Sequence, residues 1–76
     1  MSRYTAKREN GIELAYGFDH ATGYFFQVFD DSSEDGLILD EDSRFTGMSN
    51  ARMVELMKEH NLPEEHIAHV VMDLPF

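Results

Sequence analysis

The residues whose types and spacing most clearly suggest a functional site are the carboxylates concentrated in the stretch 30–42. Seven acidic side chains occur there with no Lys, Arg or His among them: Asp30, Asp31, Glu34, Asp35, Asp40, Glu41 and Asp42. Closely spaced carboxylates create a local negative field, which a basic protein surface recognises at a fast, salt-sensitive rate. The stretch predicts a partner-binding site, with an ordinary solvated loop as the alternative.

The same stretch carries an incomplete calcium-loop pattern. With Asp31 at position 1, Ser33 falls at position 3, Asp35 at 5, Gly36 at 6 and Asp42 at 12. Calcium requires several hard oxygens around a sharp glycine turn, and this spacing resembles that of an EF-hand. Position 12 is Asp where a longer, bidentate Glu is usual, and the flanks do not look like paired helices. Calcium binding through Asp31, Ser33, Asp35 and Asp42 is therefore an alternative interpretation.

Three histidines near the C-terminus form another candidate metal site. His66 and His69 are three residues apart on one helical face, Glu65 is adjacent, and His60 lies six residues before His66. Neutral imidazoles bind zinc and nickel, but no further ligand follows at a fixed spacing. We expect surface histidines here, with no metal and no cofactor.

The catalytic patterns that we sought do not occur. The chain has no cysteine, no Ser or Thr in a nucleophile elbow, no phosphate loop and no dinucleotide fingerprint. Acid pairs are too abundant to indicate a general acid and base, and a short chain has little room for an enclosed substrate pocket. We predict that the protein is not an enzyme.

Strand patterns dominate the first half of the chain. Asn10-Gly11 predicts a hairpin before the alternating run 12–18, and a turn at 19–23 separates this run from the aromatic segment 24–29. Segment 24–29 is apolar on both faces, which favours a central strand covered on two sides. Segment 37–39 predicts a short fourth strand, which pairs with the third and gathers the acids at one end of the sheet.

Helical patterns follow in the second half. Ser49 or Asn50 can cap a helix over 50–59, and Pro63 can begin a second helix with acids in its first turn. Ile67, Val70 and Val71 form the expected buried stripe, Pro75 ends the helix, and the last residues pack on the core. The order predicts an α+β fold, a four-stranded antiparallel meander followed by two helices on one face. The alternative makes segment 24–29 helical.

Length and charge limit the function further. The 76 residues predict a single domain over 1–76, with 15 acids against 6 bases and a net charge of -9. Residues 1–11 are basic, so the negative charge lies in the remainder, which repels nucleic acid and anionic membranes. Arg3, Lys7 and Arg8 are typical of a charged edge strand. Without a signal peptide or a stretch of about 20 apolar residues, the expected location is the cytoplasm.

In size, acidity and general organisation, the chain resembles the small acidic proteins of phages and mobile elements, among them anti-CRISPR inhibitors. The resemblance carries no motif. It implies an inhibitor that mimics nucleic acid and blocks a basic protein, with the acids of 30–42 as phosphate surrogates, joined by Glu55, Glu59, Glu64 and Glu65. The predicted function is thus a non-enzymatic acidic interaction protein, either a monomer or a weak homodimer. A further alternative is an accessory protein that self-associates through Met53, Met57, Leu74 and Phe76.

Overall fold

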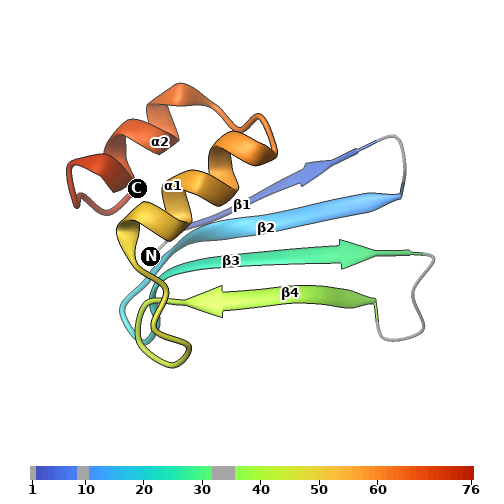
Figure 1. Ribbon diagram of the computed structural model, residues 1–76, viewed down its shortest axis with the longest axis horizontal. Helices are drawn as coiled ribbons and strands as arrows, with labels where there is room; N and C mark the ends of the chain where they lie inside the picture. The colour runs from blue at the N-terminus through green and yellow to red at the C-terminus, as the bar shows by residue number, and fades with distance from the viewer. Residues whose placement is uncertain (1, 9–10, 32–35) are drawn as a thin grey trace.

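The computed structural model describes residues 2–8, 11–31 and 36–76, which fold into a sheet and two helices (Figure 1). The elements are β1 (Ser2–Lys7), β2 (Ile12–Asp19), β3 (Gly23–Asp30), β4 (Leu37–Asp42), α1 (Asn50–Glu59) and α2 (Glu64–Val71). The strands pair antiparallel in the order β1-β2-β3-β4. The predicted α+β meander with two following helices is confirmed, and the alternative in which segment 24–29 is helical is wrong.

The helices cover one face of the sheet, and the core lies between the two layers (Figure 1). Because side chains alternate along a strand, the register brings Tyr4, Tyr16 and Phe26 onto this inner face of adjacent strands. The buried core comprises Leu14, Tyr16, Tyr24, Phe26, Val28, Met48, Met53, Leu56, Met57, Leu62 and Val70. The end of the sheet that carries Lys7 and Leu37 extends beyond α1 (Figure 1).

Among the described residues, no helix covers the other face of the sheet, so the expectation that β3 is covered on two sides is wrong. Phe25 points to this open face and is half-buried because its neighbours shelter it. Gly17 stands between Arg3 and Phe25 in the strand register, and the Arg3 guanidinium lies 5.8 Å from the Phe25 ring centre. A Cβ atom at Gly17 would approach the Ser2 carbonyl oxygen to 2.3 Å. The glycine thus permits close contact of β1 and β2.

Helix α1 has the bounds that the sequence predicts, and the Ser49 side chain caps it by accepting a hydrogen bond from the Arg52 amide. Met53 and Met57 are fully buried. Helix α2 begins just after Pro63 and carries Glu64 and Glu65 in its first turn, as predicted.

The C-terminal end of α2 differs from the prediction. Val70 is buried but Val71 is 65% exposed, because consecutive helical side chains point about 100° apart. The helix ends at Val71, before Pro75 is reached. Asp73, two residues after the end of the helix, adopts a left-handed conformation with φ 57°. Phe76 packs on the core beside Tyr4, whereas Leu74 is 44% exposed.

Strand β4 is the outer strand of the sheet and is longer than predicted. The acids continue the pairing past Leu39, with Glu41 opposite Phe26 and Asp42 opposite Phe25. Near its start, the register shifts between Val28 and Phe29 and leaves Ile38 as an extra residue. Such a bulge turns the side chain of the extra residue out of the regular alternation.

Candidate partner-binding site

The acids of segment 30–42 do not gather at one end of the sheet, so this expectation is wrong. Asp30 ends β3 and Asp31 follows it, near the start of β4, whereas Asp40, Glu41 and Asp42 form the opposite end of β4. The two other acids of the predicted site, Glu34 and Asp35, lie outside the described residues.

The three acids of β4 have different surroundings. Asp40 lies on the open face of the sheet and accepts a weak hydrogen bond of 3.4 Å from Gln27 Nε2. Asp42 organises the loop that follows the strand, because its Oδ1 accepts hydrogen bonds from the amides of Phe45 and Thr46. The Asp42 carboxylate thus has a structural role in this loop.

Glu41 points to the helix side of β4 and meets Arg52 of α1. Arg52 Nη2 lies 3.1 Å from Glu41 Oε2, and Arg52 Nη1 lies 2.9 Å from Glu55 Oε1. The hydrogen bond to Glu41, followed by the charge of Glu41 and the contacts with Glu55, raises the pKa of Arg52 above its usual value. One guanidinium thus joins a carboxylate of β4 to a carboxylate of α1.

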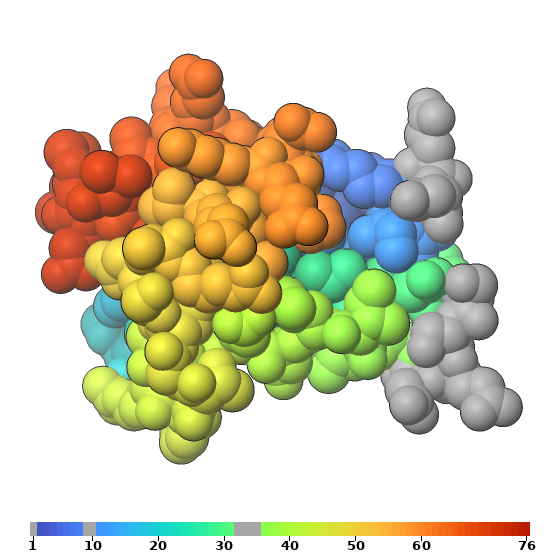
Figure 2. All heavy atoms as spheres, viewed as in Figure 1, coloured from blue at the N-terminus to red at the C-terminus, as the bar shows by residue number. Residues whose placement is uncertain are grey.

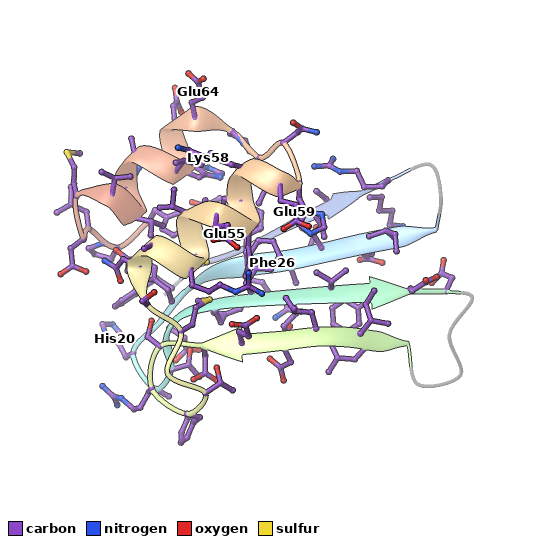
Figure 3. The ribbon with its side chains drawn as sticks, in the orientation of Figure 1. His20, Phe26, Glu55, Lys58, Glu59 and Glu64 are labelled. Carbon is purple, nitrogen blue, oxygen red and sulfur yellow. The ribbon has the colours of Figure 1, made fainter. Side chains whose placement is uncertain are left out.

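We call the outer side of β4 and the neighbouring side of α1 the acidic edge; it consists of Asp40, Glu41 and Asp42 of β4 and Glu55 and Glu59 of α1. Figure 3 shows Glu55 and Glu59 on the side of α1 nearer to β3 and β4, whereas Lys58 and Glu64 lie away from that side. Glu55 has 68% of its side chain exposed. The edge therefore has five carboxylates and one base, Arg52. Asp40 and Asp42 lie on the open face of the sheet, and the other three carboxylates lie on the helix side. The edge presents excess negative charge to solvent.

An apolar groove of about 220 Å³ lies beside the acidic edge, between β4 and α1. We call this the β4–α1 groove; it is lined by Val28, Ile38, Leu39, Arg52, Leu56, Glu59 and His60. Figure 2 shows green atoms of β3 and β4 exposed beside the orange atoms of α1. Ile38, the extra residue of the bulge, is 54% exposed. The groove thus combines aliphatic walls with a carboxylate at its rim.

A second groove, of about 260 Å³, lies on the open face of the sheet. Its lining is largely polar, and it comprises Arg3, Asp19, Thr22, Phe25, Gln27, Asp40 and Asp42. The Arg3 guanidinium already lies over the Phe25 ring there. The chain's own cation thus occupies the aromatic face that a ligand would use.

The calcium interpretation does not fit the fold. Asp31 lies near the start of β4, whereas Asp42 is the last paired residue at its other end, and a strand rise of about 3.3 Å per residue separates Leu37 from Asp42 by about 17 Å. One ion does not bridge that distance. Ser33 and Asp35 lie outside the described residues, and within the described ranges no three His, Asp or Glu side chains are placed to hold a metal ion.

The histidines take part in packing and hydrogen bonding. His66 Nδ1 shares a hydrogen bond of 2.7 Å with the Tyr16 hydroxyl, and the His66 ring lies 4.3 Å from the Tyr4 ring. His69 Nδ1 donates to the Glu65 carbonyl at 2.6 Å, one helical turn earlier. His60 packs on Phe26. The expectation of plain surface histidines is therefore wrong for His66, which belongs to an aromatic cluster.

Two tyrosines, one in this cluster and one beside it, have a raised pKa. Burial is the main cause that raises the pKa of Tyr16 above 10.0, with a smaller contribution from Tyr4. Burial also raises the pKa of Tyr24, and the charge of Asp73 adds to the effect. The Tyr24 hydroxyl donates to the Leu74 carbonyl at 2.7 Å. Both phenols thus serve the attachment of the C-terminal segment to the sheet.

The residues proposed for self-association are mostly unable to form a surface. Met53 and Met57 have no exposed area, and Phe76 packs on Tyr4 and the core. Of the four, Leu74 is the residue with substantial exposure, at 44%. The prediction that these four residues form a self-association surface is therefore wrong.

Sequence reasoning missed Arg52 and the β4–α1 groove. The available signal was the spacing of Arg52, Leu56, Glu59 and His60, which places them along one side of a helix. The bulge that exposes Ile38 had no sequence signal, because a register shift depends on how β3 and β4 pair.

Two further findings bear on the class of protein. In the described part of the chain, no helix combines the length and the apolar character needed to cross a membrane. Comparisons with protein families, with curated proteins and with solved structures find no significant match to this chain.

Proposed function

We propose that the protein is a non-enzymatic interaction protein whose acidic edge docks on a basic protein surface that normally binds nucleic acid. The observation that carries this proposal is the arrangement of Glu41, Arg52 and Glu55, which brings carboxylates of β4 and α1 within reach of one guanidinium. Docking at this edge would block nucleic acid by occupying its site. This mode of action is that of an anti-CRISPR-type inhibitor or nucleic-acid mimic.

The charge distribution supports this interpretation. The acidic edge carries five carboxylates and one base, and the whole chain has a net charge of -9. Exposed charges of one sign steer a complementary surface during diffusion, and their effect weakens as salt screens them. The same field repels phosphates, so direct binding of nucleic acid is disfavoured. Of the originally predicted acids, Asp40, Glu41 and Asp42 belong to this edge.

Affinity capture from a lysate of the source cell at low salt tests the proposal. The site variant combines Asp40→Asn, Glu55→Gln and Glu59→Gln. It spares Asp42, which organises a loop, and Glu41, which joins β4 to α1 through Arg52. The amide oxygen of Glu55→Gln can still accept from Arg52. The control variant combines Glu64→Gln, Glu65→Gln and Asp73→Asn, which removes the same charge from α2 and its end. The amide substitutions keep the shape of each side chain.

The native chain and the control variant should retain a basic nucleic-acid-binding protein, which elutes as salt rises and which added nucleic acid displaces. The site variant should bind that protein at least ten times more weakly, a difference of about 1.4 kcal/mol. Equal binding by both variants, or no competition from nucleic acid, contradicts the proposal.

A further inference from the structure

We propose that the β4–α1 groove binds an extended basic segment of the partner protein, which adds a strand to the outer edge of β4 and seats one aliphatic side chain against Ile38 and Leu56. This inference rests on the proposed function and specifies how the partner is recognised. Three features of the described residues support it: the free edge of β4, the aliphatic walls of the groove and the carboxylates at its rim.

The first feature is the backbone of β4. The Ser43 amide donates to the Tyr24 carbonyl, and antiparallel pairs alternate between bonded and non-bonded positions. The backbone groups of Asp40 and Asp42 therefore point away from β3. Those of Asp42 are already used, because its amide donates to Thr46 Oγ1 and its carbonyl accepts from the Met48 amide. Asp40 is thus the position on this edge where an added strand would pair.

The second feature is the set of aliphatic side chains next to that edge. Val28 and Leu39 lie opposite each other in the sheet, and Leu56 of α1 forms the facing wall. Ile38 is 54% exposed because the bulge places it outside the regular alternation. The volume of about 220 Å³ is enough for one branched side chain. An inserted leucine or valine would cover apolar surface that Ile38 now exposes to water.

The third feature is the charge around the groove, which favours a basic binding partner. Glu59 lies at the rim of the groove, and Asp40 lies on the adjoining strand edge. Arg52 also lines the groove, but Glu41 and Glu55 already pair with it. A basic segment therefore complements the rim. A second copy of this chain is disfavoured because each copy has a net charge of -9.

The test uses a seven-residue peptide, Lys-Thr-Lys-Leu-Lys-Thr-Lys, with blocked ends and a fluorescent label. Two matched peptides replace the leucine with glycine, or every lysine with glutamate. Fluorescence anisotropy measures affinity at low salt, and amide chemical shifts of the labelled protein locate the site. The protein variants are Ile38→Ser and Glu59→Lys. Their controls are Val71→Ser, which also replaces an exposed β-branched aliphatic residue with serine, and Glu64→Lys, which makes the same charge change; both positions are exposed in α2.

We expect the leucine peptide to bind and to shift the amides of 37–40 and 56–60. Ile38→Ser and Glu59→Lys should each weaken binding at least fivefold, and the two control variants less than twofold. Equal binding of the leucine and glycine peptides, or chemical-shift changes at other residues, contradicts the proposal that the groove binds the segment. Such a result leaves the proposed acidic interaction function standing. Failure of every basic peptide to bind at low salt overturns both. Shifts at 2–7 that grow with protein concentration indicate pairing between copies, and also overturn the groove.

Discussion

At the scale of single residues, the phenols of Tyr16 and Tyr24 connect the sheet to the C-terminal half of the chain. Tyr16 bonds to His66 of α2, and Tyr24 bonds to the carbonyl of Leu74. Phe76 stacks on Tyr4 at a ring distance of 5.5 Å. These contacts join residues about 50 or more positions apart. They therefore fix the placement of α2 on the sheet.

Stability should fall at alkaline pH because of these two phenols. Both have a pKa above the 10.0 of a free tyrosine in the folded protein, so the folded state holds the two protons more tightly than the unfolded state does. Their contribution is complete below about pH 10 and is lost as the pH rises through the folded pKa values. Urea unfolding from pH 8 to pH 11 should show this decline.

The variant that combines Tyr16→Phe and Tyr24→Phe should be less stable than the native chain at pH 8, by about 1 kcal/mol for each lost hydrogen bond. Its stability should then change less between pH 9.5 and pH 11, because these two titrating groups are gone. A decline as steep as that of the native chain would assign the alkaline loss to other groups.

The roles of individual residues were also the hardest features to predict from the sequence. The sequence identified the acids of β4, but alternation along the strand sends Glu41 to Arg52 and leaves Asp42 to organise a loop. Such roles depend on the partner that the fold brings near. Val71 was misassigned for a related reason, because α2 ends there and its outer side faces solvent.

At the scale of elements, α1 is the most predictable part of the molecule. Its cap, its length and its buried methionines follow from local spacing, which tertiary contacts do not override here. Strand β4 shows the opposite case. Asp and Glu are depleted in strands, so the pattern ended at Leu39, yet pairing with Phe26 and Phe25 extends the strand to Asp42. The candidate site lies largely on this extension.

Removal of the α1 cap should weaken the whole fold, because Met53 and Met57 of this helix belong to the core. Ser49→Ala loses the hydrogen bond of 3.1 Å to the Arg52 amide and should lower the free energy of unfolding by about 1 kcal/mol. Ser49→Asp keeps an accepting oxygen and should stay near the native value. Urea denaturation measures both, and an equal loss in the two variants would contradict the capping role.

At the scale of the whole molecule, the excess of carboxylates acts against compactness. A net charge of -9 on 76 residues repels itself in the folded state more than in the expanded unfolded chain. An increase from 20 to 200 mM sodium chloride should screen this repulsion. The melting temperature should rise by several degrees, since about 1 kcal/mol corresponds to about 4–8 °C for a domain of this size.

The variant that combines Asp40→Asn, Glu55→Gln and Glu59→Gln should melt at a higher temperature at low salt and respond less to added salt. Differential scanning calorimetry measures both quantities. A melting temperature that does not change with salt in either protein would show that the acids are too far apart to repel one another.

The order of the strands has a consequence for the speed of folding. Each strand pairs with its neighbour in sequence, and only a few residues of the sequence separate β1 from β2 and β2 from β3. Closing short loops costs little chain entropy, so these hairpins can form early and independently of the helices. The helices then close over a sheet that already exists. Nascent chains would thus spend little time with the edges between neighbouring strands unpaired, which limits aggregation during synthesis.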